Sequence, residues 1–222
     1  MSKTLYLPYK TVIASQLLQI SKLNKMLKRT FDFVFSILGL IVLLPFLLII
    51  CLLIKIDSKG PILFKQKRVG KHNIDFTIYK FRTMRIQSDK KGLLTIGNND
   101  SRITKIGYFL RRYKIDEFPQ LINIIKGDMS FVGPRPELRY YVNFYNKSDM
   151  EIYRVRPGIT GLASLKYRNE VELLKQAADP ETFFIETIIP DKLKFNKEYI
   201  KKSNFFFDLK LIALTIIKVI TK

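Results

Sequence analysis

The chain has 222 residues, of which 47% are hydrophobic and 13% aromatic, so it can bury a core and is not a disordered chain. Its formal net charge of +20 indicates an anionic partner: nucleic acid, an anionic membrane surface or a phosphorylated substrate. The single cysteine, Cys51, excludes an intramolecular disulfide. Together with the single histidine, His72, it also excludes a Cys/His zinc site by count.

The first segment is basic and amphipathic. Hydrophobic residues recur at helical spacing from Val12 to Leu27, with lysines between them. This pattern is typical of a helix lying in the headgroup region of a membrane, although a helix packed on the protein's own core would look the same. Residues 1–32 are therefore predicted to form an N-terminal interfacial segment.

An uncharged apolar run follows, from Phe33 to Ile54. About 20 such residues can cross a bilayer, and a buried helix of a soluble protein is the alternative. Lysines and arginines, including Lys28 and Arg29, flank the run on both sides, and such residues prefer the cytoplasmic side. Pro45 near the middle is expected to kink the helix. We therefore predict a monotopic protein with a re-entrant, Pro-kinked membrane helix over 33–56, rather than a simple transmembrane anchor.

The pattern after this run is mixed. Residues 62–64 and 76–81 predict strands of a small β-hairpin, with a turn at 70–73. The polar residues 90–101 predict a loop, and residues 106–112, 116–126, 139–146 and 190–202 predict helices. Residues 205–222 predict a C-terminal interfacial helix. The expected fold class is α+β, mostly helical with a small β-hairpin, and residues 57–204 form its cytoplasmic domain.

The densest chemical pattern is LRRYKIDEFPQL, residues 110–121. Asp116 is expected to be the N-cap of a helix whose first turn holds Pro119. A helix N-terminus and neighbouring cations would favour ionised carboxylates and bind phosphate. Because adjacent helical residues do not share a face, Asp116 and Glu117 are expected to have different roles. The alternative is an ordinary N-cap beside a surface ion pair.

Two proline-containing segments follow. Pro134 and Pro136 fix the backbone around Arg135, so this guanidinium would lose less entropy on gripping a phosphate or a base. Residues 156–161 read RPGITG, a basic, turn-rich loop. Each segment alone is equally compatible with plain turn chemistry.

Six segments in this order resemble the bacterial sugar transferase family, the monotopic phosphoglycosyl transferases that start glycan assembly on polyprenyl phosphate. They are KRTFD (28–32), FKQKRVG (64–70), YKFRTM (79–84), the Asp116–Glu117 block, GPRP (133–136) and RPGITG (156–161). The resemblance runs from about Lys28 to Leu214. Larger relatives carry several N-terminal transmembrane helices, so this chain resembles the minimal catalytic unit, with residues 57–204 as the catalytic domain.

The resemblance implies a ping-pong reaction at the cytoplasmic face of the bacterial inner membrane. Asp116 would attack the β-phosphate of a UDP-sugar, expel UMP and hold the phosphosugar until polyprenyl phosphate removes it. Glu117 would complete the dyad, as a metal ligand or by activating the acceptor, and Mg²⁺ would bind at Asp116 and Glu117. Arg135 would contact the nucleotide. Further phosphate contacts are expected from Arg111, Arg112, Lys67, Arg68 and Arg82.

A non-catalytic basic scaffold on anionic lipids is the alternative, because it would explain the charge. It does not require the Asp116–Glu117 pair or the proline-flanked Arg135. A nucleic-acid partner is not expected, since the basic residues spread along the chain and flank a membrane run. The sequence names neither the sugar nor the oligomeric state, and it leaves a homodimer open.

Overall fold

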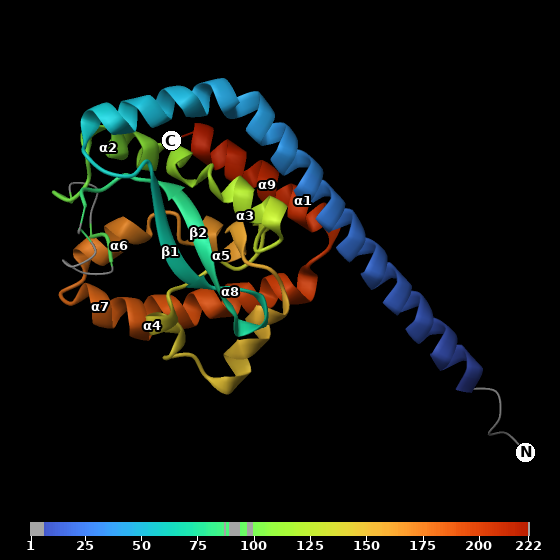
Figure 1. Cartoon of the computed structure of the whole chain (residues 1–222). Coiled ribbons are helices and arrows are strands. Elements are labelled where there is room, and N and C mark those ends of the chain that lie inside the picture. Colours follow the sequence, from blue (N-terminus) through green and yellow to red (C-terminus); the bar gives the residue numbers. More distant parts are fainter. Residues whose placement is uncertain (1–6, 87, 89–93, 97–99, 222) are drawn as a thin grey trace, which may run out of the picture.

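The computed structural model describes residues 7–86, 88, 94–96 and 100–221, with the side chains of α1 described from residue 22 onward. Helix α1 (Leu7–Asp57) has 51 residues and continues through Pro45. Figure 1 shows that α1 rises beside the folded body and then changes direction to run over it. The predicted interfacial segment and membrane helix are thus parts of one helix. Most of the amphipathic pattern predicted before Lys28 lies outside the described side chains.

The part of α1 from Lys22 to Asp57 is long and apolar enough to cross a membrane. Only 11% of its most apolar stretch is buried inside the protein. A core helix of a soluble protein would be mostly buried, so this helix is compatible with membrane association.

The predicted hairpin is confirmed. Strands β1 (Leu63–Val69) and β2 (Asp75–Phe81) are antiparallel, with Leu63 opposite Phe81, and the short helix η1 (Lys71–Asn73) forms the turn. A second sheet was not predicted. It consists of β3 (Ser130–Val132) and β4 (Gly158–Thr160), which pair in parallel.

Helices make up most of the remaining described chain, as expected for this fold class. They are α2 (Lys105–Arg112), η3 (Ile115–Glu117), α3 (Gln120–Lys126), α4 (Arg139–Val142), η4 (Lys147–Arg154), α5 (Leu162–Lys166), α6 (Glu170–Gln176), α7 (Pro180–Phe183), η5 (Phe184–Ile188), α8 (Ile189–Lys202) and α9 (Phe205–Ile220). The predicted helices over 106–112 and 190–202 are confirmed, as is a helix in the C-terminal segment. The helix predicted over 139–146 is shorter, and much of the loop predicted over 90–101 lies outside the described residues.

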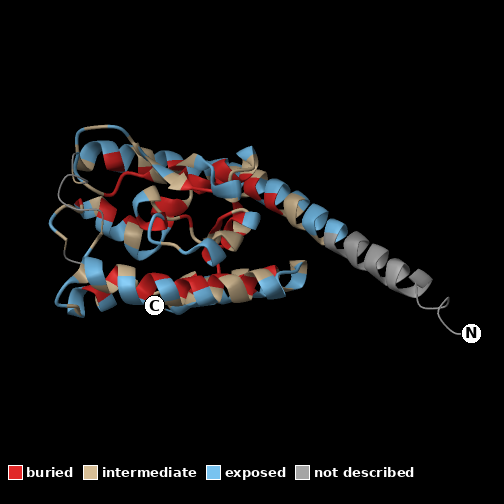
Figure 2. Ribbon diagram, turned by 90° about the horizontal axis from the view of Figure 1, so that it is seen from below, coloured by how far each residue is buried: buried red, intermediate tan, exposed pale blue. Residues whose placement is uncertain are grey.

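The core holds α1 on the rest of the protein. Leu47, Ile50 and Ile54 of α1 pack with Phe81 of β2, and with Leu110 and Ile115 around the Asp116 block. Figure 2 shows the buried residues on the sides of the elements that face one another. The packing therefore places the second half of the apolar run against Ile115, the residue before the Asp116–Glu117 pair.

Lys28 and Arg29, which flank the apolar run, also point into protein contacts. Lys28 Nζ donates to the Val132 carbonyl at 2.9 Å and forms an ion pair with Asp208 of α9. Arg29 donates to the carbonyls of Ile124 and Ile125, at 2.7 and 3.0 Å, at the end of α3. Because the last carbonyls of a helix have no partner within it, Arg29 satisfies the end of α3 and docks α1 onto it.

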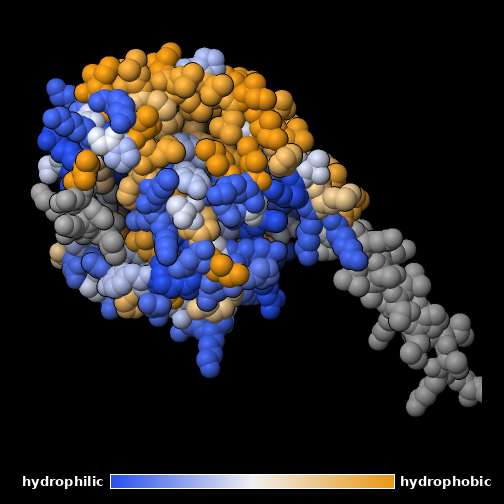
Figure 3. All heavy atoms as spheres, viewed as in Figure 1, coloured by the Kyte–Doolittle hydropathy of each residue, from blue (hydrophilic) through white to orange (hydrophobic). Residues whose placement is uncertain are grey.

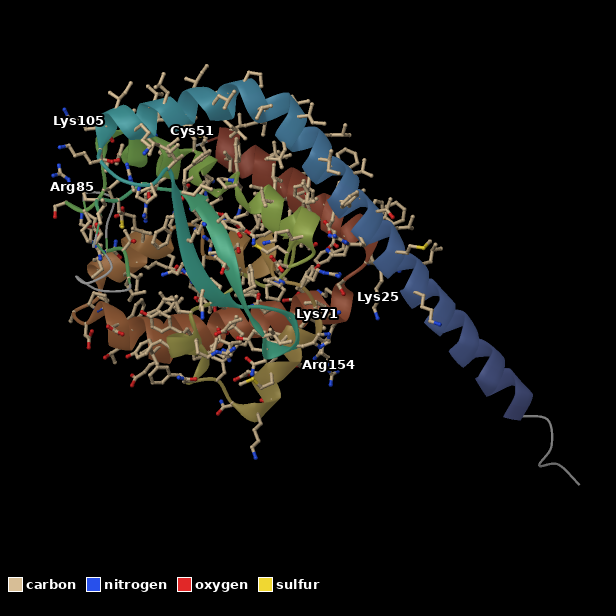
Figure 4. All side chains as sticks on the ribbon, in the orientation of Figure 1. Lys25, Cys51, Lys71, Arg85, Lys105 and Arg154 are labelled. Atoms are coloured by element: carbon tan, nitrogen blue, oxygen red, sulfur yellow. The ribbon has the colours of Figure 1, made fainter. Side chains whose placement is uncertain are left out.

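One side of the molecule is apolar. Large hydrophobic side chains stand exposed along α1 and α9, for example Ile41, Val42 and Ile56 of α1 and Phe206 and Ile220 of α9. In Figure 3 the hydrophobic residues cover the side where α1 runs over the body, and hydrophilic residues gather on the opposite side. Figure 4 shows Lys71 and Arg154 on that opposite side, and Lys105 at the edge near the end of α1. An exposed apolar face of this extent is typical of membrane-associated surfaces.

Candidate active site

Asp116 and Glu117 lie in the short helix η3, between α2 and α3. The chain leaves α2 through Lys114, whose φ of 59° is left-handed, and Ile115 then inserts into the core beneath α1. The predicted N-cap role of Asp116 is wrong. Helix α3 begins at Gln120 with Pro119 as its N-cap residue, and Asp116 makes no capping hydrogen bond. An N-cap side chain accepts from the N–H groups two or three residues later, and Pro119, three residues after Asp116, has no N–H. In addition, Glu117 N–H donates to the Lys114 carbonyl at 3.2 Å, which closes the turn before α3.

Glu117 is held by two cations. Lys80 Nζ of β2 lies 3.0 Å from Glu117 Oε1. Arg135 donates through Nη2 to Oε1 at 2.5 Å and through Nη1 to Oε2 at 3.3 Å, a bidentate geometry. Burial alone would raise the pKa of Glu117, but Arg135 and Lys80 outweigh it and hold this pKa well below its usual range. Glu117 is therefore a fixed anion that orders two cations.

Asp116 has a different environment from Glu117. It is buried, and its Oδ1 has no hydrogen-bond partner in the protein. Burial raises its pKa, and the attraction of Lys80 opposes that rise without cancelling it. The neighbouring cations favour the ionised form of Asp116, as expected, but the cost of removing this carboxylate from water is larger, so its pKa rises. The result is a carboxylate with an oxygen available to a ligand.

Glycines bring Arg135 to this site. A Cβ on Gly133 would lie 2.3 Å from the Arg156 carbonyl oxygen, and one on Gly158 would lie 2.1 Å from Gly133 N. Only glycine permits that approach, so the GPRP and RPGITG segments can lie against each other as the parallel strands β3 and β4. The loop that follows β3 then directs Arg135 onto Glu117.

A second charged group lies beside the first. Arg68 of β1 donates to the Pro136 carbonyl at 3.2 Å and lies 3.8 Å from Glu137. Glu137 in turn is paired with Lys192 of α8 at 2.8 Å. The site thus contains an alternating series of cations and carboxylates.

All of these side chains line one large cavity, with a volume of about 1630 Å³. Its polar wall includes Asp116, Glu117, Lys80, Arg68, Arg135, Glu137 and Lys192. Its apolar wall includes Phe35, Gly39 and Leu43 of α1, and Ile212 and Ile216 of α9. Phe35 and Ile216 are also more than half exposed on the outer apolar face. The cavity therefore joins a cationic site to the surface expected to meet lipid.

The basic residues predicted to contact phosphate differ in whether they line this cavity. Arg68, Arg111, Arg112 and Arg135 line the cavity, whereas Lys67 is exposed and is not one of its lining residues. Lys67 precedes Arg68 in β1, so its side chain points to the other face of the hairpin. Arg82 lines the cavity but donates to the Ile54 and Ser58 carbonyls, at 3.3 and 2.6 Å, at the end of α1.

Lys80 is a site residue to which the sequence prediction gave no role. The available signal was a lysine inside the otherwise strand-like segment from Phe76 to Phe81. Lys80 lies two residues after the buried Ile78, so both side chains point to the same, inward side of the strand. A lysine in such a position needs a charged partner.

The donor set for a metal ion is sparse. Among the described residues, no group of three or more His, Cys, Asp or Glu side chains could hold one. Of the two predicted ligands, Asp116 has an oxygen without a protein partner, whereas Glu117 is engaged by Lys80 and Arg135. Mg²⁺ is commonly held by one or two carboxylates together with substrate phosphates, so Asp116 fits this ion and Glu117 fits only if it releases a cation.

Comparison with known proteins matches residues 23–222 to the family model described as bacterial sugar transferase. The UDP-glucose:undecaprenyl-phosphate glucose-1-phosphate transferase of Escherichia coli (strain K12) is 36% identical over 203 residues, which cover 90% of this chain and 41% of the relative. A UDP-N-acetylgalactosamine-undecaprenyl-phosphate N-acetylgalactosaminephosphotransferase of Aeromonas hydrophila is 36% identical over 204 residues, with coverages of 90% and 45%. The chain thus spans less than half the length of these two relatives. The uncharacterized sugar transferase EpsL of Bacillus subtilis (strain 168) is 37% identical over 194 residues, with 87% of each chain covered.

Proposed function

The chain belongs to the bacterial sugar transferase family, and we propose that it transfers a sugar 1-phosphate from a UDP-sugar to polyprenyl phosphate, releasing UMP. The observation that carries this proposal is the unpartnered Oδ1 of Asp116 in a cavity with cations on one wall and apolar side chains of α1 and α9 on the other. The names of the Escherichia coli and Aeromonas hydrophila relatives, which combine a UDP-sugar with undecaprenyl phosphate, support the two substrate classes.

In the first step a carboxylate oxygen of Asp116 attacks the β-phosphorus of the donor. The bond between this phosphorus and the bridging oxygen breaks, and UMP leaves with that oxygen and its electron pair. The phosphosugar remains on Asp116 as an acyl phosphate. Arg135, Arg68 and Arg111 line the same cavity and would neutralise the negative charge that develops on the donor phosphates.

In the second step a phosphate oxygen of the polyprenyl acceptor attacks the same phosphorus. The bond to Asp116 breaks, the carboxylate is regenerated, and the product is a polyprenyl diphosphosugar. The acceptor oxygen is already anionic, so the balance of this step does not require a base. The apolar wall formed by α1 and α9 gives the polyprenyl chain a hydrophobic route to the site.

Glu117 keeps the two cations of the site in place. Its contacts with Lys80 and Arg135 fix both side chains beside Asp116, which reduces the reorganisation needed when the donor binds. Asp116 would hold Mg²⁺ together with phosphate oxygens of the donor, and the bound ion would supply further neutralisation of the pyrophosphate.

The membrane part of the proposal is a re-entrant α1 on the cytoplasmic face of the inner membrane. Basic residues flank the apolar run at both ends, and α1 changes direction over the body. These features favour entry and exit on one side. Tags at both termini, probed in intact spheroplasts, test this arrangement; labelling of either terminus from outside would reject it.

The function is tested by incubating the membrane-embedded protein with a panel of UDP-sugars, Mg²⁺ and polyprenyl phosphate. We expect UMP and a lipid-linked diphosphosugar in equal amounts with at least one donor. A panel that yields neither product would contradict the enzyme and favour the non-catalytic scaffold.

A further inference from the structure

Lys192 joins two carboxylates on the wall of the cavity. It lies on α8, its side chain is only 8% exposed, and its Nζ is 2.8 Å from Glu137 Oε1 and 3.1 Å from Glu170 Oε2. Glu137 follows β3 and Glu170 begins α6, so one ammonium group connects three separate segments. A lysine this enclosed normally requires charged partners, and here it has two.

The two carboxylates lie among the cations expected to serve the donor. Glu137 is 3.8 Å from Arg68 Nη1 and two residues from Arg135 in the chain. Glu137 and Glu170 both act electrostatically on Arg135. Glu137 can therefore compete with Glu117 and with a bound phosphate for both Arg68 and Arg135, and Glu170 can compete for Arg135.

We propose that Lys192 is a positioning residue that neutralises Glu137 and Glu170 and so leaves Arg68 and Arg135 available to the donor pyrophosphate. Without Lys192, Glu137 and Glu170 lose the ammonium group that lies 2.8 and 3.1 Å away, and a mostly buried carboxylate such as Glu137 then needs another cation. Arg68, at 3.8 Å, needs only a small movement to form a full ion pair with Glu137. That movement would withdraw a cation from the cavity.

This inference rests on the proposed function for the identity of the ligand, but the charge arrangement can be tested separately. UDP carries the pyrophosphate of the donor and cannot be turned over to a lipid product. Its affinity therefore reports the positions of the cations without requiring catalysis.

The variants are Lys192→Met, Lys192→Arg and the double variant Lys192→Met/Glu137→Gln. Lys202→Met is the matched control, because Lys202 lies on the same helix, is 62% exposed and pairs only with Glu198 among the described residues. UDP binding is measured by calorimetry, and initial rates of UMP release are measured against donor and against polyprenyl phosphate.

Lys192→Met should weaken UDP binding and raise the donor KM by about tenfold or more, since small misplacements of binding groups have effects of this size. The KM for polyprenyl phosphate should stay unchanged. Lys192→Arg and the double variant should recover most of the affinity, because both restore the charge balance at Glu137.

A double variant that binds UDP no better than Lys192→Met would overturn the inference and leave Lys192 a purely structural link. An equal rise in both KM values would do the same. If the wild type binds UDP with this pattern across the variants but releases no UMP from any donor, the proposed function fails and the role of Lys192 in anion binding stands.

Discussion

Removal of the Lys80 charge is the perturbation that most directly tests the electrostatics of the site. Lys80→Met keeps the length and apolar stem of the side chain and removes the ammonium group 3.0 Å from Glu117 Oε1. At that separation, with an effective dielectric constant of about 20, the attraction amounts to about 5.5 kcal/mol. Arg135 remains bound to the same carboxylate. The whole attraction is lost with the ammonium group, but because Arg135 still neutralises Glu117 we expect a net cost of about half its size.

A loss of about 2–3 kcal/mol in transition-state stabilisation corresponds to a decrease of about 30- to 160-fold in kcat/KM. The variant also loses the cation that opposes the rise in the pKa of Asp116. Because Asp116 must be ionised to attack, the acidic limb of the activity profile should move to higher pH.

The assay is the initial rate of UMP release at low donor concentration, measured as a function of pH. Lys126→Met is the control, because Lys126 is exposed and contacts Tyr79, the neighbour of Lys80. It should leave both the rate and the pH profile close to those of the wild type. A Lys80→Met variant with wild-type kcat/KM and an unmoved acidic limb would contradict this role of Lys80.

Three further predictions concern the pH profile and the packing that supports the site. In the wild type, kcat/KM should fall with decreasing pH at a pH above 3.8, the ordinary pKa of an aspartate, because burial raises the pKa of Asp116 while Glu117 stays ionised. If the acidic limb of the pH profile lay at or below 3.8, the assignment of that limb to Asp116 would be contradicted. Gly133→Ala should lower the free energy of unfolding by about 3 kcal/mol, since its Cβ would lie 2.3 Å from the Arg156 carbonyl oxygen. Thermal unfolding in detergent checks this, against Gly39→Ala, where the new Cβ meets Leu121 at an ordinary 3.4 Å. Arg29→Met should lower the free energy of unfolding by about 2–3 kcal/mol, because it removes two charged hydrogen bonds to α3. Lys25→Met, at an exposed position, should leave it unchanged. Equal melting temperatures for the two variants would contradict the docking role of Arg29.

Local patterns predicted much of the fold. The hairpin, α2, α8 and α9 follow from alternation, helical spacing and capping signals, all of which act within a few residues. The parallel pair β3 and β4 was missed because each strand has only three residues and its partner lies about 28 positions away along the chain. No local period marks such a short pairing. Its signal was the glycines, whose role appears only when the two backbones meet.

The sequence predicted which residues form the site better than it predicted how they contact one another. The family motifs indicated Asp116, Glu117 and Arg135, and the structure brings all three to one cavity. The sequence could not show that Arg135 and Lys80 share Glu117, because their contacts with Glu117 span 18 and 37 positions. Nor could it show that desolvation outweighs the cations at Asp116, since that balance depends on burial. The Lys192 pairing required α8 to be folded against the loop after β3.

In the proposed mechanism, Asp116 carries the phosphosugar during turnover. The most direct measurement is mass spectrometry of the protein quenched after incubation with a reactive UDP-sugar and Mg²⁺ and without polyprenyl phosphate. We predict one equivalent of UMP and a peptide containing Asp116 whose mass is increased by one phosphosugar, with neither present in Asp116→Asn. Formation of UMP only when polyprenyl phosphate is also present, with no adduct on the peptide, would contradict the covalent mechanism.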